Sequence, residues 1–316
     1  MEHISPEKWI GERSFQPEKD LSKLKLETYW VRMMKSVVPI PELDSMLGIR
    51  KSAAFLYCGE AGTGKRTLAR ALAGSLAQQK YACYELSGAD LNEDMEQRLV
   101  ALMKRWSDGE SAILICQNLQ GCSDSAALGN CLAQMIQLCE QQNLPVIFVV
   151  IEENHEAVPV ELMRQLLVCR FDLPDLDERE AFYSAVIGKG FPLKEGLRTR
   201  DLAVAAEGLT LRQLVITLRF MQRGVKELAM VRFKSRYTMA QDAIRNKEVV
   251  VDMPMFRSIV AHVKNPEPEK QAPIQIVQTV AATPAPAAHT SEQEQPTSKT
   301  DVLRQSKNMS DFFNNL

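Results

Sequence analysis

The chain has 316 residues, a hydrophobic fraction of 45%, a charged fraction of 25% and a formal net charge of −2. This is the composition of a globular protein of about two domains, which excludes a fully disordered or fibrous chain. No stretch reaches the roughly 18 uncharged apolar residues of a membrane-spanning helix, and Met1 to Leu21 lack the apolar core of a secretion signal. The sequence therefore predicts a cytoplasmic protein without a membrane span.

Cysteine and histidine patterns predict no metal centre. The chain has seven cysteines, an odd number without paired C-x-x-C spacing, which argues against a disulfide framework and against a zinc site. The four histidines are scattered too widely for a metal site or a catalytic triad. We therefore predict reduced cysteines that mostly belong to the core.

Residues 1–50 are a charged, amphipathic N-terminal segment. After it, short apolar runs alternate with helical periods of about 10–15 residues, the pattern of βαβ units around a buried parallel sheet. The candidate strands are Ala53–Tyr57, Tyr81–Leu86, Ile113–Cys116 and Val146–Ile151. Residues 51–178 are therefore predicted to form an α/β domain.

Helical spacing dominates over residues 179–264, where only Val249–Val251 looks like a strand, and this predicts a second, smaller, helical domain. Residues 265–300 contain six prolines and no aromatic residue. Such a segment cannot bury enough apolar surface to offset the entropy lost on ordering. We expect it to form a disordered linker.

Residues 301–316 regain apolar side chains at the end of this linker. Met309, Phe312 and Phe313 are spaced as in the short peptide that docks on sliding clamps, although Ser306 replaces the leading glutamine of that motif. A motif on a flexible tether reaches its partner at high effective concentration. The segment therefore predicts a docking peptide for a protein partner; the alternative is a terminal helix that folds back on its own domain.

Charge is segregated along the chain. Residues 51–178 carry 10 Lys and Arg against 18 Asp and Glu, a balance of −8, whereas residues 179–262 carry 15 against 8, a balance of +7. Seven cations gather in the segment 212–236: Arg212, Arg219, Arg223, Lys226, Arg232, Lys234 and Arg236. This basic cluster predicts a face for nucleic-acid phosphates or a surface that docks on the acidic block of another copy, and we favour the second. The plain alternative is a solvated helix surface.

The strongest motif lies between a predicted strand and a predicted helix. It consists of Gly59, Glu60, Ala61, Gly62, Thr63, Gly64, Lys65, Arg66 and Thr67. The glycines let backbone N–H groups wrap a phosphate, the helix N-terminus attracts its charge, and Lys65 reaches the outer phosphates. The motif therefore predicts a phosphate-binding loop for ATP or ADP.

Together with Leu47–Ile49 and Phe55–Tyr57, this loop resembles the opening of an AAA+ ATPase module, and the helical domain resembles that family's lid. The resemblance covers about residues 20–262. It implies a parallel sheet domain followed by the lid, and assembly with other AAA+ subunits.

The resemblance also implies roles for three polar residues. Asn154, just beyond the fourth strand, matches the family's polar sensor residue. Arg164 stands where family members often carry an arginine finger for the neighbour's nucleotide. Arg212, in the lid, matches an arginine that contacts the phosphates.

The loop departs from the family pattern after its lysine. In the family a Ser or Thr hydroxyl holds magnesium there, but this loop has Arg66, and Thr67 comes one residue late. A guanidinium beside the phosphates would replace part of the metal's charge and repel the metal itself. We therefore predict that chelating magnesium changes nucleotide affinity little.

The third strand departs from the family as well. The family's strand ends in an Asp-Glu pair that supports magnesium and activates water, whereas here Gln117 and Asn118 follow Ile113–Cys116. Amides orient a water but cannot accept its proton near neutral pH, and losing a general base typically costs about 10²–10⁴ in rate. Glu153, or its neighbour Glu152, is the candidate substitute.

The function that the sequence favours is an ATP-binding regulatory or scaffold subunit with impaired or absent hydrolysis. One alternative is an active ATPase that remodels a protein or nucleic-acid complex. The other is an interaction module without nucleotide.

Overall fold

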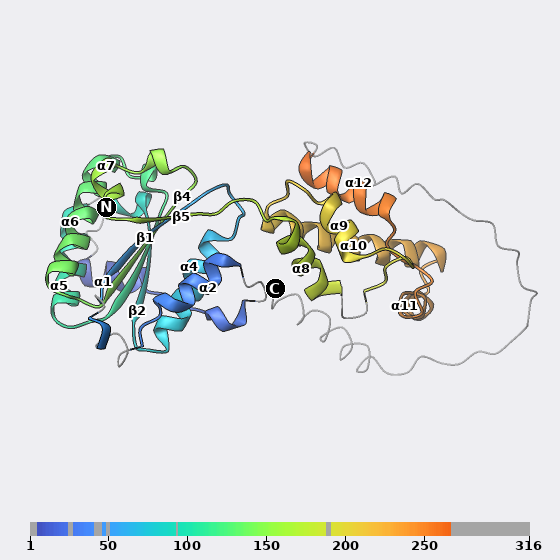
Figure 1. Ribbon diagram of the computed structural model, residues 1–316, viewed down its shortest axis with the longest axis horizontal. Helices are drawn as coiled ribbons and strands as arrows, with labels where there is room; N and C mark the ends of the chain where they lie inside the picture. Colours follow the sequence, from blue (N-terminus) through green and yellow to red (C-terminus); the bar gives the residue numbers. More distant parts are fainter. Residues whose placement is uncertain are drawn as a thin grey trace, which may run out of the picture. The chain divides into compact units, whose positions relative to one another are not determined.

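In the computed structural model, the part of the chain that ends with β5 is built around a sheet of five parallel strands, in the order β2-β3-β4-β1-β5 (Figure 1). The described residues are 5–24, 28–40, 46–48, 51–92, 94–187 and 191–266. The strands are β1 (Ala53–Cys58), β2 (Ala82–Ser87), β3 (Ala112–Gln117), β4 (Val146–Glu152) and β5 (Leu167–Arg170). The parallel α/β sheet predicted from the apolar runs is confirmed.

Helices cover both faces of this sheet, which is why its strands read as continuous apolar runs. One face carries α1 (Pro6–Arg13), α5 (Met95–Ser107), α6 (Ser125–Gln141) and α7 (Val160–Met163), and the other carries α2 (Tyr29–Val37) and α4 (Lys65–Ala77) (Figure 1). Side chains alternate along each strand. In β3, Ile113 and Ile115 accordingly face the α4 layer, and Leu114 faces the α5 and α6 layer.

The N-terminal segment is part of the α/β core. In α1, Trp9 and Ile10 are buried against one face of the sheet, and in α2 Met34 is buried against the other. Between the two helices the chain runs antiparallel to β2, where the backbone N–H of Phe15 donates to the carbonyl of Cys83 at 3.0 Å. This contact covers the β2 edge, which would otherwise expose unpaired backbone groups.

The order of the strands brings three carboxyl ends together. β1 lies between β4 and β5, with β3 on the far side of β4. Ligands of open α/β sheets bind beyond the carboxyl ends of such strands. The register places Glu152 of β4 beside Cys58 of β1, and Gln117 of β3 beside Ile151.

The described residues after the sheet are largely helical, as predicted. The helices are α8 (Leu176–Ile187), α9 (Thr199–Ala205), α10 (Leu211–Arg232), α11 (Tyr237–Arg245) and α12 (Met253–Lys264). Their core centres on Tyr183, whose ring meets Phe256 edge-on at 5.7 Å and whose hydroxyl lies 3.1 Å from that of Thr217. The run Val249–Val251, expected as a strand, forms a single bridge from Val251 to Leu193.

The predicted docking peptide, residues 301–316, lies outside the described residues. So does the predicted linker, residues 265–300, except for its first two residues. Among the residues that are described, none of the helices combines the length and the apolar character needed to cross a membrane.

Candidate nucleotide-binding site

The phosphate loop joins β1 to α4 at the carboxyl end of the sheet. Its glycines adopt left-handed backbone conformations, with φ of 139° at Gly59, 87° at Gly62 and 97° at Gly64. A Cβ added at Gly59 would lie 2.2 Å from the carbonyl oxygen of Phe171, so neither the backbone nor the space accepts a side chain. The first N–H groups of α4 have no partner within the helix and are suited to an anion.

Lys65 opens α4 and is 7% exposed. Its ammonium donates to the carbonyl oxygens of Gly59 at 2.6 Å and Glu60 at 2.7 Å, across the mouth of the loop. Burial lowers the pKa of Lys65 below its usual value, against the opposing charges of Glu153 and other carboxylates. A phosphate would supply the anion that this partly desolvated cation lacks.

The start of α10 lies against the same loop. The backbone N–H of Arg212 donates to the carbonyl of Gly62 at 3.0 Å, and a Cβ on Gly62 would come within 3.0 Å of the Arg212 Cβ. The Thr210 hydroxyl oxygen caps α10, and it would lie 2.9 Å from the same added Cβ on Gly62. The structure thus brings Arg212, which is exposed, to the loop with which the sequence associated it.

The end of β3 carries amides where a general base would be needed. Gln117 is half-buried and donates from Nε2 to Oε1 of Glu85 at 3.2 Å. Asn118 is exposed and left-handed, with φ of 52°. Neither residue offers a carboxylate to a water molecule.

Glu152, the last residue of β4, is a buried carboxylate beside this strand end. It accepts a hydrogen bond from the backbone N–H of Leu119, in the turn that follows β3. Burial is the main cause that raises the pKa of Glu152, and this hydrogen bond opposes the shift. The carboxylate therefore ties the end of β4 to the turn after β3.

The raised pKa of Glu152 predicts a pH-dependent stability difference between the wild type and Glu152→Gln. The folded wild type binds this proton more tightly than the unfolded chain, so its free energy of unfolding falls as pH rises through and above 4.5, the usual pKa. In Glu152→Gln this group does not titrate, so the variant's free energy of unfolding should not fall in this way. Urea unfolding of both proteins from pH 4 to 7.5 measures how the difference between their free energies changes. Glu152→Ala should be less stable at every pH, by about 1–3 kcal/mol, because the Leu119 N–H loses its acceptor. A difference that does not change with pH would contradict the assignment.

Glu153 and Asn154, the two residues that follow β4, differ in their roles. The Glu153 side chain is exposed, and its backbone carbonyl accepts the N–H of Gly59 at 3.1 Å, which fixes the start of the loop. Asn154 caps the short 3-10 helix His155–Ala157, where its Oδ1 accepts the N–H of Glu156 at 3.0 Å. The sensor role expected of Asn154 stays a prediction.

Arg164 directly follows α7 as its C-cap and is exposed to solvent. Its side chain is 66% exposed and Nη1 lies 3.1 Å from the Glu161 carboxylate. Such an exposed pair contributes little to stability, so the guanidinium is free to exchange partners. The finger role expected of Arg164 therefore stays a prediction.

The basic cluster predicted over residues 212–236 lies on α10 and on the turn that leads to α11 (Tyr237–Arg245). Four of its cations are exposed along one stripe of α10, three to seven residues apart: Arg212, Arg219, Arg223 and Lys226. Arg223 pairs with Glu227 at 2.7 Å, and Arg232 donates to the Glu248 carbonyl at 2.8 Å.

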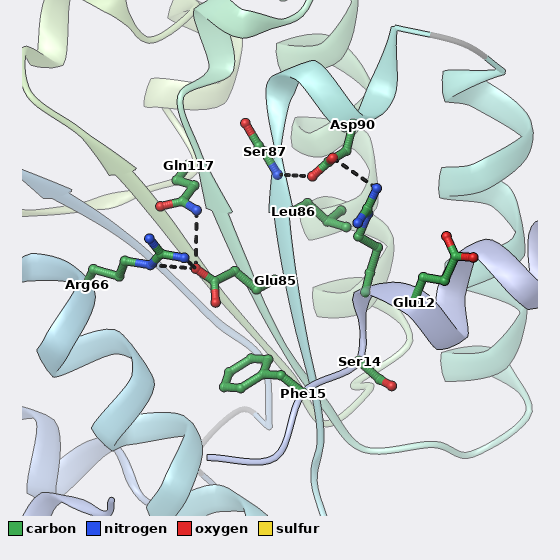
Figure 2. Close-up of a pocket in the computed structure, with 10 residues that line it drawn as sticks. Glu12, Ser14, Phe15, Arg66, Glu85, Leu86, Ser87, Asp90 and Gln117 are labelled. Carbon is green, nitrogen blue, oxygen red and sulfur yellow. Dashed lines mark hydrogen bonds and ion pairs between the residues drawn. The ribbon is translucent and has the colours of Figure 1, made fainter. Parts of the chain in front are cut away.

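Sequence reasoning missed two residues beside the loop, Glu85 and Arg70. Glu85 of β2 accepts from Arg66 at 2.7 Å and from Arg70 at 2.7 Å, and Figure 2 shows the Arg66 guanidinium and the Gln117 amide converging on its carboxylate. The spacing of Arg66 and Arg70, one helical turn apart, was an available signal. It did not reveal the carboxylate that they share.

These features define a P-loop fold: a parallel sheet, a glycine loop after a central strand, and a helical part that contacts the loop. Residues 55–173 match the family model described as ATPase family associated with various cellular activities (AAA). Residues 55–173 therefore form a domain that is similar to the AAA ATPase family.

The fold also matches a solved structure titled "Structural Basis for Katanin Self-Assembly", with a TM-score of 0.53 and 16% sequence identity. The match covers 83% of this chain and 97% of that chain. At this identity the likeness concerns the fold alone. No curated protein matches the sequence.

Proposed function

We propose that this AAA+ protein binds ATP or ADP, turns it over slowly or not at all, and acts as a regulatory or scaffold subunit of a cytoplasmic assembly. One observation carries the proposal: the loop between β1 and α4 combines left-handed glycines with the buried Lys65, while the end of β3 presents Gln117 and Asn118. Binding and cleavage depend on different groups, so a chain can keep the first and lose the second.

The residues present fit the phosphates of a nucleotide. The left-handed glycines give the loop a conformation that can wrap a phosphate, Lys65 supplies a buried ammonium, and the backbone of Arg212 contacts Gly62. With ATP bound, Lys65 would exchange its carbonyl partners for phosphate oxygens and Arg212 would add a second cation.

The residues present do not fit the magnesium ion that accompanies nucleotide in this family. Within the described ranges no three His, Cys, Asp or Glu side chains gather so as to hold a metal. Arg66 occupies the place of the hydroxyl ligand, and Gln117 the place of the carboxylate. Guanidinium has no lone pair to offer a metal, and an amide oxygen is a weaker ligand than a carboxylate.

Two carboxylates remain as substitutes for the general base, and each has an argument against it. Glu152 already accepts the Leu119 N–H, which removes part of its basicity toward water. Glu153 is exposed, and a solvated carboxylate is a weak base near neutral pH. The active ATPase with Glu153 as base therefore remains the alternative.

Assembly is favoured by the opposite charges of the two parts of the chain, −8 over residues 51–178 and +7 over residues 179–262. The exposed stripe of α10 and the exposed Arg164 suit contact with an acidic neighbour and with that neighbour's nucleotide. The expected partner is a catalytically intact AAA+ paralogue, whose bound nucleotide Arg164 would contact. DNA or RNA backbones are the other candidate ligand of the stripe.

Threading of a polypeptide is disfavoured by the segment after β2. It carries no aromatic side chain to grip a substrate, and Asp90 pairs with Arg13 of α1 at 3.0 Å. The Asp90 carbonyl also accepts from Arg98 of α5 at 2.6 Å. Because two helices hold this segment in place, it is poorly suited to move and pull a polypeptide substrate.

One purified sample tests both binding without turnover and assembly. We expect the wild type to bind a fluorescent ATP analogue, to grow in mass by light scattering when ATP is added, and to release phosphate at the background rate of Lys65→Ala. Lys65→Ala should lose about tenfold or more in ATP affinity, because a charge-assisted hydrogen bond is worth roughly 1.5–3 kcal/mol.

The outcomes separate the candidate functions. Repeated turnover that Lys65→Ala abolishes would establish the active ATPase. No binding of the analogue with or without magnesium would favour the interaction module. DNA affinity that falls steeply with salt, without growth in mass, would assign the basic stripe to nucleic acid.

A further inference from the structure

Four side chains beside the phosphate loop form a cluster that links α4, β2 and β3. Arg66 donates from Nε and Nη2 to Oε1 of Glu85, at 2.8 and 2.7 Å, and Arg70 donates from Nε and Nη2 to Oε2 at 2.9 and 2.7 Å. Gln117 adds a third donor to Oε1 at 3.2 Å. Figure 2 shows Arg66 and Gln117 approaching the Glu85 carboxylate from two different elements.

Strand alternation explains why these groups meet. Side chains two residues apart on a strand point to the same face of the sheet. Cys83 in β2 and Ile115 in β3 face α4, so Glu85 and Gln117 face α4 as well. Arg66 and Arg70 lie one turn apart on α4 and cover the same spot. The cluster therefore lies over β2 and the end of β3, on the face of the sheet that α4 covers, and Arg66 connects it to the loop.

The cluster has a surplus of positive charge. Two guanidinium groups share one carboxylate and a neutral amide, which leaves a net charge of +1 within these four side chains. Glu85 is held tightly, with 10% of its side chain exposed, whereas Arg66 is 53% exposed. A divalent cation brought to this place would meet fixed positive charges, while a phosphate oxygen would meet a cation that is already in position.

Arg66 can reach an anion without leaving Glu85. Its Nε and Nη2 are engaged with the carboxylate, and Nη1 has no partner among the described residues. The cluster borders an open cavity of about 260 Å³, which Arg66, Glu85 and Gln117 line together with Arg13, Glu12 and Asp90. A guanidinium held on one side by a carboxylate is pre-organised, because Glu85 fixes its orientation before a ligand arrives.

We propose that the Arg66–Glu85–Arg70 cluster takes the place of magnesium, so that the chain binds nucleotide phosphate without a divalent cation and Glu85 positions Arg66 for it. This inference rests on the proposed binding of nucleotide at the loop. It adds that the charge which other AAA+ domains take from a metal comes here from the chain's own side chains.

The test is the affinity of the full chain for a fluorescent ATP analogue, measured by anisotropy in excess EDTA and in excess magnesium. The wild type should differ less than about threefold between the two buffers, a small effect on the scale where tenfold is 1.4 kcal/mol. Arg66→Thr, which removes the guanidinium and supplies a hydroxyl, should bind at least about tenfold more weakly than the wild type in EDTA.

Arg257→Thr is the matched control, because it makes the same change of charge at an exposed position on α12, outside the loop and the basic cluster. It should bind like the wild type in both buffers. Thermal unfolding without nucleotide checks that each variant folds, and Arg66→Gln replaces Arg66→Thr should the latter not fold.

Failure of this inference differs from failure of nucleotide binding itself. A wild type that loses tenfold or more in EDTA, or an Arg66→Thr variant that binds like the wild type there, overturns the cluster's role and leaves nucleotide binding standing. A wild type that binds the analogue in neither buffer overturns both.

Discussion

Replacing Arg66 by Thr, Gln117 by Asp and Asn118 by Glu in one chain is expected to raise phosphate release by about 10²–10⁴-fold, the usual contribution of a positioned general base. The first two changes supply oxygen ligands for magnesium and remove the repelling guanidinium, and the third supplies the base. The new Asp lies next to Glu85, so turnover should depend on magnesium to screen the two carboxylates.

The backbone at Asn118 sets the limit of this gain. Its φ of 52° is left-handed, and a Glu there is strained by roughly 1–3 kcal/mol, so we expect the lower half of the range. The same triple variant with Lys65→Ala is the control and should return to background. A triple variant that binds ATP but releases no more phosphate than the wild type would show that these three residues do not limit hydrolysis.

Gly59→Ala is expected to lower the free energy of unfolding by about 2–6 kcal/mol, from backbone strain and overpacking of roughly 1–3 kcal/mol each. The residue has φ of 139°, and the added Cβ would meet the Phe171 carbonyl oxygen at 2.2 Å. Relief of this contact must move the loop away from β5 or distort it. ATP affinity should therefore fall as well, and urea unfolding and anisotropy measure the two effects.

Gly109→Ala is the matched control for the backbone effect. Gly109 is also left-handed, with φ of 105°, but no heavy atom lies within 4 Å of its added Cβ. Its substitution should cost about 1–2 kcal/mol and leave ATP affinity unchanged. If Gly59→Ala were no less stable than Gly109→Ala, the contact with Phe171 would not be what demands glycine.

Much of the fold could be predicted because its signals are local. The apolar runs gave four of the five strands within one or two residues, and the glycine spacing placed the loop before α4. The N-terminal segment was harder. Its charges suggested an amphipathic surface, yet Trp9 and Met34 are buried on opposite faces of the sheet, which its composition does not reveal.

The candidate site was predicted less completely than the fold. Lys65 and Arg212 could be named from motifs, and the structure brings them to one loop. The capping bond of Asn154 to Glu156 and the tie from Glu152 to Leu119 could not be named, since the same side chains had other available partners. Only the folded arrangement chooses among such partners.

By itself, the sequence determined which segments become strands, where the glycine loop lies, and that the end of the third strand carries no acid. Each of these three features depends on residues that are close together in the sequence, so their spacing and chemistry can be interpreted without the fold. The tertiary structure alone decided that Arg66 turns to Glu85 and that Gln117 joins it. Those contacts depend on how α4 lies over β2 and β3, and that follows from the packing of the whole sheet.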